Sequence, residues 1–561
     1  MSELDEKSLP LPPILPICEV IHDRLAIEVM RGCTWGCRFC QAGYVNRPLR
    51  IRPEQDILKA IEKGIRQTGW EEISLVSFTI LDYPDLLNLI RKLNEILKKK
   101  MINISLPAMR GELFSEEIAI LLKEIKKTGL TFAPETASEK LRCRLNKPFS
   151  NEKLISSINT AYKLGWKHVK LYFMVGLPFE KNDDIAEIDT LVGQILEAYP
   201  KGSIKLSGYA SNICPTKVSI SAMSSFFSRA DDKSFPVIES VYKQGGKFEE
   251  WREGFDFSRW QAAFEATGVD PKKYLKPKDK YPWDFIDIGV EKDFLKQELI
   301  HAQNAVTTEN CYYEHCSNCG ACDGKMDKYQ QKAEKYVCYG RYPKRKARPI
   351  SYRVKYTIGE SFRYASHLDI TRTIYRSLRR SDLPIQFTQG FSPIPKVSFC
   401  PPKSVGQVAK GDFFDFYLDS EYFGNISIEL NARFPSGIRI LEVRAIPVNT
   451  PSLSNSINLI YYEVNLPQND IKKSLGFSSD KPIYIKTKSG MKNILDGLES
   501  ISLNNGILTC GLYFGIKKIN IYELLSYLTN LLIESAKIYK ITRTTMFIKK
   551  GGILHSPMEV K

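Results

Sequence analysis

Six short apolar runs alternate with helical patterns between residues 25 and 209, and this alternation constrains the fold more than any other feature. The runs are Leu25–Met30, Ile73–Phe78, Ile102–Leu106, Leu130–Ala133, Val169–Val175 and Ser203–Tyr209. Strands that alternate with helices pair in parallel, and the active site of such a barrel lies at the carboxyl ends of its strands. We therefore predict an α/β fold with a partial (β/α)6 barrel.

Three cysteines follow the first apolar run with the spacing C-x3-C-x2-C: Cys33, Cys37 and Cys40. Three thiolates on so short a loop can hold three irons of a [4Fe–4S] cube and leave the fourth iron open, as a catalytic site requires. A zinc knuckle or three reduced core thiols would be the alternatives. The loop leaves a strand at the predicted active-site edge, which favours the cluster. Phe39, directly before the third cysteine, is a candidate cofactor contact.

A second cysteine set lies in the middle of the chain and has the spacing C-x4-C-x2-C-x2-C. Its members are Cys311, Cys316, Cys319 and Cys322. Tetrahedral zinc and a second iron–sulfur cluster both suit four such thiolates, and the sequence leaves the two open. Before this set, Phe257, Trp260, Ala263 and Phe264 suggest a helix that packs on the barrel.

The amino-acid composition limits which binding partners and which cellular compartment we expect. The net charge is +16, from 80 Lys+Arg against 64 Asp+Glu. This excess favours a polyanionic partner such as nucleic acid, although a soluble basic protein would show it too. Thirteen cysteines, seven of them in the two sets, indicate metal binding in a reducing compartment. No signal peptide and no apolar run of about 20 residues is present, so we expect a cytoplasmic chain without a membrane span.

The chain divides at shifts in composition. We expect a tail over 1–22, the barrel over 23–235 and a helical extension with the second cysteine set over 236–340; a basic linker over 341–350 and a C-terminal α+β domain over 351–561 follow. In the last region strands alternate with helices in a pattern that suggests two ferredoxin-like halves.

A predicted helix from His367 to Ser381 carries a basic face. The spacing of Arg372, Arg376, Arg379 and Arg380 places all four on one side of that helix. RNA or DNA phosphate is one ligand for such a strip, which would make the C-terminal domain the nucleic-acid site. A solvated helix face is the alternative.

Several motifs together resemble the radical S-adenosylmethionine (SAM) superfamily, and within it an uncharacterised bacterial family of cobalamin-type proteins with a fused C-terminal domain. They are the cysteine loop running into Gln41-Ala42-Gly43, the stretch Thr131–Glu135, and the pair Ser366–Asp369 and Gln389–Pro393. The resemblance implies that the first three cysteines bind a [4Fe–4S] cluster. It also implies that SAM chelates the open iron and that a flavodoxin or ferredoxin donates the electron.

The resemblance also implies which residues contact SAM. Glu135 and Ser138 would bind its ribose or its amino-acid part, and Val175 and Gly176 would let adenine approach the backbone. Either Arg144 or Lys147 would pair with the carboxylate.

The family usually carries an N-terminal cobalamin-binding domain, which needs on the order of a hundred residues. Only 32 residues precede Cys33 here, so we expect cobalamin to come from a separate chain or to be unused. The leading hypothesis is a radical SAM enzyme that modifies tRNA or rRNA. Two rival hypotheses are a radical SAM enzyme acting on a small molecule, lipid or peptide, and a non-catalytic iron–sulfur module that binds RNA.

Overall fold

The computed structural model gives the fold over most of the chain. It describes residues 4, 8–98, 100–107, 109–123, 129–197, 205–208, 223–224, 226–249, 251, 253–275, 281, 283–322, 349–389, 393–473, 475, 482–487, 490–515 and 518–559. The linker expected over 341–350 lies almost wholly outside these residues, as do Gly390, Phe391 and Ser392.

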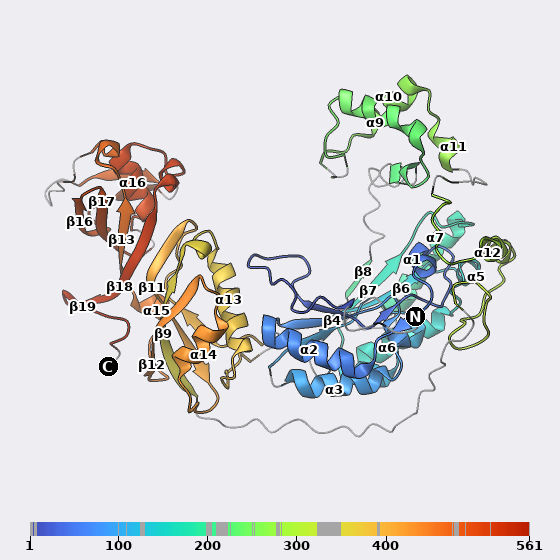
Figure 1. The fold of residues 1–561 in the computed structure, drawn as a ribbon, viewed down its shortest axis with the longest axis horizontal. Helices are drawn as coiled ribbons and strands as arrows, with labels where there is room; N and C mark the ends of the chain where they lie inside the picture. The colour runs from blue at the N-terminus through green and yellow to red at the C-terminus, as the bar shows by residue number, and fades with distance from the viewer. Residues whose placement is uncertain are drawn as a thin grey trace.

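Six parallel strands form the barrel part of the molecule (Figure 1). They are β1 (Leu25–Glu28), β4 (Glu72–Val76), β5 (Asn103–Ser105), β6 (Leu130–Glu135), β7 (His168–Phe173) and β8 (Lys205–Gly208). β1, β4 and β5 pair in that order, β6, β7 and β8 do the same, and a parallel bridge between Met109 and Phe132 joins the two groups. The predicted partial (β/α)6 barrel is therefore confirmed.

Helices cover the outside of these strands. Their bounds are α2 (Glu54–Thr68), α3 (Leu86–Lys98), α4 (Glu116–Lys123), α5 (Glu139–Arg144), α6 (Asn151–Lys163) and α7 (Asn182–Glu197). The apolar stripe of α3, for example, is formed by Leu86, Ile90, Leu93 and Leu97, and all four are buried. The N-terminal segment expected to be a tail packs Leu9, Leu11 and Leu15 against the barrel core.

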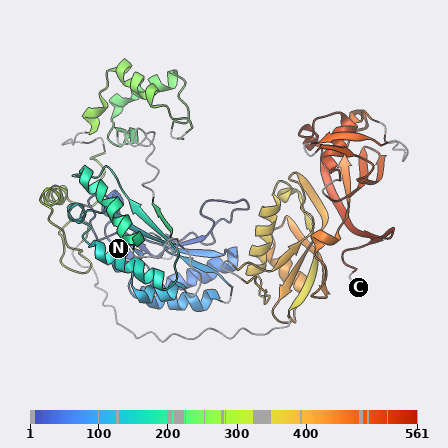
Figure 2. The same ribbon diagram turned by 180° about the vertical axis from the view of Figure 1, so that it is seen from behind.

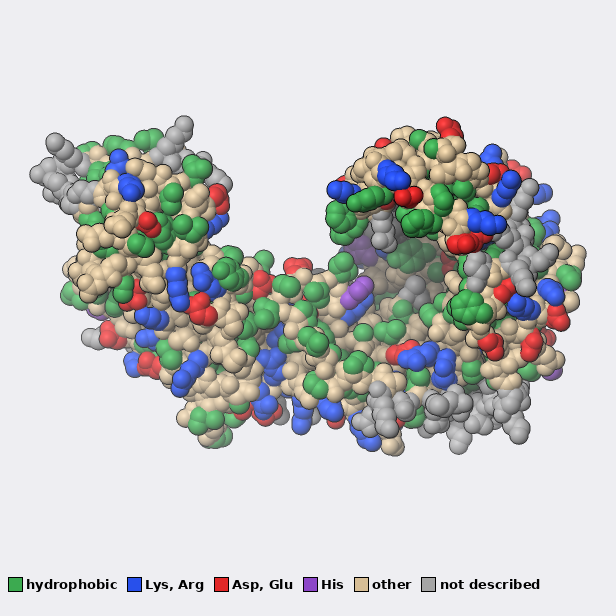
Figure 3. All heavy atoms as spheres, turned by 45° about the horizontal axis from the view of Figure 1, so that its top comes forward, with side chains coloured by type: hydrophobic (Ala, Val, Ile, Leu, Met, Phe, Trp, Pro, Cys, Tyr) green, Lys and Arg blue, Asp and Glu red, His purple; other side chains and the backbone are tan. Residues whose placement is uncertain are grey.

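A separate group of helices follows the barrel: α9 (Phe235–Lys243), α10 (Phe257–Thr267) and α11 (Pro271–Leu275). The helix expected around Trp260 is present as α10, but its apolar face does not pack on the barrel. Trp260, Ala263 and Phe264 instead form a core with Phe226 and Val241, so these helices make a unit of their own. Figure 3 shows a hollow between this unit and the barrel.

The C-terminal domain consists of two ferredoxin-like halves in one continuous sheet. The first half contains β9 (Ile350–Ile358), α13 (His367–Arg380), β10 (Val397–Phe399), β11 (Gln407–Leu418), α14 (Ile426–Arg433) and β12 (Ile438–Ile446). The order in space is β12-β9-β11-β10, which is the ferredoxin-like order 4-1-3-2. This half confirms the α+β prediction.

The second half repeats the strand order, with one helix fewer among its described residues. Its elements are β13 (Leu459–Asn465), β16 (Leu498–Asn504), β17 (Ile507–Tyr513), α16 (Ile521–Thr529) and β18 (Ile541–Lys550), and they pair as β18-β13-β17-β16. A hairpin of β14 (Tyr484–Thr487) and β15 (Gly490–Asn493) lies in the long connection after β13. Parallel pairing of β11 with β18 joins the two halves.

Helix α13 begins at a capping box that explains the Ser366–Asp369 motif. The backbone N–H of Asp369 donates to Ser366 Oγ at 3.2 Å, and the backbone N–H of Ser366 donates to the Asp369 carboxylate at 3.0 Å. The motif therefore has a local structural reason in this chain.

The four arginines of α13 face the barrel, and this corrects the expectation of an exposed basic strip. Arg376 and Arg379 are only 4% and 2% exposed. Their partners, and those of the other two, are as follows: Arg372 pairs with Glu19 and Asp23, Arg376 with Asp23 and the Pro16 carbonyl, Arg379 with Glu71, and Arg380 donates to the carbonyls of Thr68 and Arg433. The sequence pattern showed the shared face but not the acidic residues that cover it.

This contact fixes where the C-terminal domain sits. Asp23 and Glu71 directly precede β1 and β4, and Gly69 caps the end of α2. A Cβ atom at Gly69 would lie 2.2 Å from the Arg376 carbonyl oxygen, so the two backbones approach closely. The domain thus docks on the amino-end face of the barrel, opposite the carboxyl ends of the strands, and Figures 1 and 2 show α13 beside α2 from both sides.

Arg376→Ala is expected to loosen this docking. It removes one of the two arginines that pair with the Asp23 carboxylate, together with the bond to the Pro16 carbonyl. Because Arg372 stays paired with Asp23, the cost should lie below the roughly 3 kcal/mol of a fully broken buried pair. We expect a larger radius of gyration by small-angle X-ray scattering. Arg439→Ala, at an exposed arginine of the same domain, should leave the radius unchanged. Identical scattering from both variants would contradict an interdomain role for Arg376.

Within the described residues, no helix combines the length and the apolar character that a bilayer span needs.

Candidate active site at the cysteine loop

Cys33, Cys37 and Cys40 lie on the loop between β2 (Met30–Arg31) and α1 (Gln41–Val45), at the carboxyl-end side of β1. Gly32 permits the sharp entry, because it has a positive φ of 93° and a Cβ there would lie 2.7 Å from two carbonyl oxygens. Gly43 of α1 lies beside the thiols, since a Cβ on it would be in ordinary contact with Cys40 Sγ at 3.7 Å. The cysteine loop thus packs against the helix that follows it.

Two cations face these thiols. The Nη1 atom of Arg110 lies 3.7 Å from Cys37 Sγ, and the Arg110 guanidinium stacks on the Trp35 ring at 3.9 Å. Burial raises the pKa of Cys37, and the charges of Arg110 and Lys147 oppose that rise. Burial also raises the pKa of Cys33 to about 12. Binding a metal cluster therefore has to release the thiol protons, and the two cations favour the thiolates.

The donor set on this loop fits a cluster. Three thiolates can bind three irons of a [4Fe–4S] cube and leave the fourth iron open. The two cations beside the thiols suit the negative charge of such a cube.

Glu135 and Lys147 form an ion pair at the end of β6. The Nζ atom of Lys147 lies 2.8 Å from Glu135 Oε1 and donates to the Ala133 carbonyl at 2.6 Å. Glu135 has a positive φ of 66°, which is uncommon for a residue with a side chain and recurs at functional sites. The structure thus brings together two of the residues proposed for SAM. Ser138 is buried at the start of α5 and receives no side-chain cap bond.

Val175 and Gly176 follow β7 and border open space. Val175 is 44% exposed, and nothing lies within 4 Å of a Cβ placed on Gly176, whose φ is 88°. A flat ligand group would meet backbone without a side chain at Gly176, whose N–H donates to Glu180 Oε2 at 2.6 Å. The Phe39 side chain packs in an apolar cluster with Leu141, Leu145 and Leu177, so it supports the cysteine loop by packing.

Arg144 does not face the open site, which corrects its proposed role as a carboxylate partner. Its Nη1 atom donates to the carbonyls of Ala302 and Gln303, at 3.3 and 2.8 Å, and its guanidinium stacks on Phe179. These carbonyls end helix α12 (Lys292–Asn304). Of the two alternatives for the SAM carboxylate, only Lys147 stands near the cysteines.

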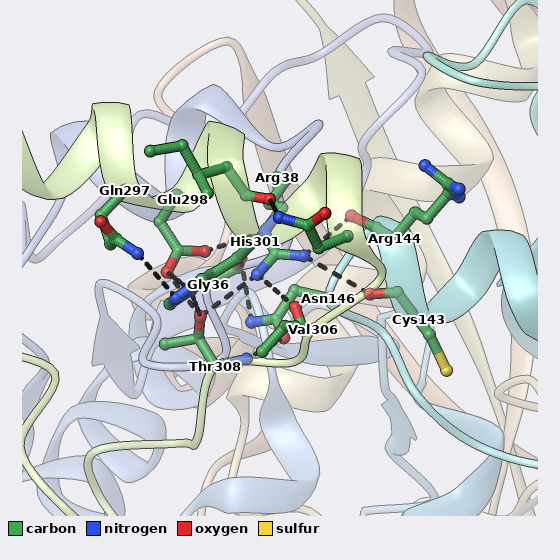
Figure 4. Close-up of polar contacts among 12 residues, drawn as sticks. Gly36, Arg38, Cys143, Arg144, Asn146, Gln297, Glu298, His301, Val306 and Thr308 are labelled. Carbon is green, nitrogen blue, oxygen red and sulfur yellow. Dashed lines mark hydrogen bonds and ion pairs between the residues drawn. The ribbon is translucent and has the colours of Figure 1, made fainter.

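Arg38, between the second and third cysteines, ties the loop to α12 (Figure 4). Its Nε donates to Glu298 Oε2 at 2.9 Å, and the two side chains are 8% and 6% exposed. Its remaining nitrogens donate to the carbonyls of Arg144 and Val306, at 2.9 and 2.8 Å. No sequence pattern indicated this pair, because Glu298 lies 260 positions away.

Asn146 and Thr308 complete this clamp (Figure 4). Asn146 Nδ2 donates to the Trp35 carbonyl at 2.9 Å, while its Oδ1 accepts from the backbone N–H of Thr308 at 2.8 Å. The Thr308 hydroxyl donates to Glu298 Oε1 at 2.5 Å. The segment with Val306 and Thr308 leads to the second cysteine set, and it therefore packs against the first cysteine loop.

Asp82 bridges the two cysteine loops. Trp35 Nε1, between Cys33 and Cys37, donates to Asp82 Oδ2 at 2.6 Å, and Tyr313 OH donates to Asp82 Oδ1 at 2.8 Å. Burial raises the pKa of Asp82, and the two hydrogen bonds oppose the rise. This carboxylate therefore connects the first cysteine loop with the second.

Comparison with known proteins identifies the two main parts of the chain. Residues 27–192 match the model of the radical SAM superfamily, so the chain carries a radical SAM domain. Residues 351–526 match a second family, described as an uncharacterized protein conserved in bacteria (DUF2344), which covers the first ferredoxin-like half and most of the second.

Similar proteins match the radical SAM part. An uncharacterized protein of Methanocaldococcus jannaschii is 30% identical over 32% of this chain and 39% of its own length. A tRNA-2-methylthio-N(6)-dimethylallyladenosine synthase of Clostridium perfringens is 25% identical over 32% of this chain and 41% of its own. The chain thus spans about two fifths of these relatives. Among solved structures, the radical SAM methyltransferase TsrM of Kitasatospora setae is 15% identical, with a TM-score of 0.27 over 30% of this chain and 34% of that one.

Proposed function

We propose that the chain is a radical SAM enzyme whose substrate is RNA. The single observation that carries the radical SAM assignment is the cysteine triad, gathered beside Arg110 and Lys147 at the carboxyl-end side of the strands in a domain that matches the superfamily. When bound there, a [4Fe–4S] cluster supplies the electron that cleaves SAM into methionine and a 5′-deoxyadenosyl radical.

The residues of this chain would hold and orient the reactants. Cys33, Cys37 and Cys40 would bind the cluster, and Arg110 would stabilise the charge of the Cys37 thiolate. Lys147 is placed to bind a carboxylate, because its present partner is the carboxylate of Glu135. The bare backbone at Gly176 would accommodate adenine. Cobalamin has no assigned residues in this arrangement.

RNA is supported by the charge and by one relative. The net charge of +16 favours a polyanion, and the similar Clostridium perfringens protein is a tRNA-modifying synthase by name. The arginines of α13 are used at the domain interface and do not contribute. Figure 3 shows Lys and Arg interspersed with Asp and Glu over the face drawn, so the support from charge is the net excess and not a patch on that face.

Cys37→Ala tests the activity. In the anaerobically reconstituted full chain reduced with dithionite, we expect 5′-deoxyadenosine and methionine to form from SAM, and the variant to abolish both, because the cluster loses one of its three protein ligands. Cys18→Ser, at an exposed cysteine outside both sets, should behave like wild type. Absence of SAM cleavage by the reconstituted wild-type chain would refute the proposed activity.

Nucleoside mass spectrometry tests the substrate. We expect one modified nucleoside of tRNA or rRNA to disappear when the gene is deleted, and to return with the wild-type but not with the Cys37→Ala chain. Unchanged nucleosides together with intact SAM cleavage would favour the alternative substrates, a small molecule, lipid or peptide. RNA binding that persists without any cleavage of SAM would favour a non-catalytic module.

A further inference from the structure

The second cysteine set plays no part in the chemistry proposed above, yet its loop is built around its thiols. It follows α12, and it turns at Asn318 and Gly320, whose φ angles are 51° and 83°. The Asn318 backbone N–H donates to Cys316 Sγ at 3.4 Å. Such N–H to sulfur bonds are among the features that set the potential of an iron–sulfur cluster.

The four thiols lie close together along one loop. Their spacing places four cysteines within twelve residues, and the Cys311 thiol interacts electrostatically with Cys316, Cys319 and Cys322. Four thiolates on one loop can bind the four irons of a [4Fe–4S] cube. A tetrahedral zinc site would use the same four thiolates, and metal analysis separates the two.

The set has a solvent side and a buried side. Cys316 and Cys322 are exposed, Cys311 is half-buried, and Cys319 is buried at 7% exposure. Cys319 packs in one apolar cluster with Tyr44 of α1. The buried side therefore faces the first cysteine loop, and the exposed side faces solvent.

Two contacts connect the two loops. Tyr44 packs against Cys319, and its hydroxyl donates to the carbonyl of Gly36, the neighbour of Cys37, at 2.9 Å. Asp82 accepts one hydrogen bond from each loop, as described above. The two cysteine sets are thus parts of one packed unit.

We propose that Cys311, Cys316, Cys319 and Cys322 bind a second [4Fe–4S] cluster that relays electrons to the first. A reduced carrier protein of the flavodoxin or ferredoxin class loses one electron to the second cluster at its exposed side. That cluster then passes the electron to the one at the first loop and returns to its oxidised state, without any bond being made or broken. The relay rests on the radical SAM activity proposed above, whereas the cluster itself does not.

Metal analysis tests the cluster. The anaerobically reconstituted full chain should contain about eight irons, four for each cube, and the Cys316→Ser/Cys322→Ser chain about four. The iron content of the Cys37→Ala chain reports on the cube at the first loop. The Cys18→Ser chain should keep all of its iron. About four irons with one zinc in the wild type, and loss of the zinc alone in the double variant, would overturn the proposal.

Two reductants test the relay. With reduced flavodoxin, SAM cleavage by Cys316→Ser/Cys322→Ser should fall by about tenfold or more, while with dithionite, which reaches the first cluster directly, it should stay within about twofold of wild type. If SAM cleavage by the double variant fell equally with both reductants, the second cysteine set would have a structural role only. If cleavage were retained equally with both, a relay would be excluded. Failure of the wild type with both reductants would refute the radical SAM activity but leave the iron count as an independent result.

Discussion

Glu298→Ala is expected to destabilise the domain that carries the cysteine loop by about 3–5 kcal/mol, because it leaves the buried Arg38 guanidinium without its carboxylate. The loss reaches the loop itself, since Arg38 lies between two of its cysteines and Glu298 also accepts from Thr308. We expect a lower denaturant midpoint for this domain and a chain purified with little iron at the first site.

The same helix offers a matched control. Asp293 and Lys296 form an ion pair on α12 whose side chains are 90% and 75% exposed. Asp293→Ala should therefore change neither the midpoint nor the iron content, because exposed pairs contribute little. An equal effect of the two substitutions would mean that α12 acts through its general stability and not through the clamp on Arg38.

Asp412→Ala is expected to destabilise the C-terminal domain by a similar amount, about 3–5 kcal/mol. Asp412 on β11 accepts from Arg543 on β18 through both of its oxygens, with Nε to Oδ1 at 2.9 Å, and both side chains are almost fully buried. Arg543 also donates to the Pro401 carbonyl at 2.9 Å. The substitution would leave a buried cation at the strand pair that joins the two halves, and urea unfolding of the full chain should show an earlier transition for this domain.

Lys410→Ala is the control on the same strand. Its partner Glu463 lies on β13, and the two side chains are 62% and 41% exposed. Breaking this pair should cost about 0–1 kcal/mol. If Asp412→Ala were equally mild, the parallel pairing of β11 with β18 would have to be held by the apolar core alone.

The parts of the fold that could be predicted are those with a local signal. Buried parallel strands are nearly continuous apolar runs, so all six barrel strands could be read from the sequence, and spacing alone indicated the cysteine loop. β16, in contrast, has no such signal. Its sequence LESISLN is about half polar because the strand lies at the edge of its sheet.

The parts that could not be predicted depend on partners far along the chain. A helix face shows which arginines are neighbours, but not that Asp23 and Glu71, some 300 positions earlier, cover them. Arg144 failed as a SAM ligand for the same reason, since its acceptors end a helix about 160 positions later. Arg38 and Asp82 gave no distinct signal either. The proposed SAM contacts at Glu135, Ser138, Val175 and Gly176 stay predictions.

Docking of the C-terminal domain at the amino-end face of the barrel sets a minimum reach for the substrate. β6 contains six residues and therefore separates the two faces by about 20 Å, at roughly 3.3 Å per residue. A molecule that is held by the C-terminal domain and reacts at the cysteine loop has to extend over at least this length. Many small metabolites are shorter than this, whereas a folded polymer can be bound at one end of the enzyme and modified at the other.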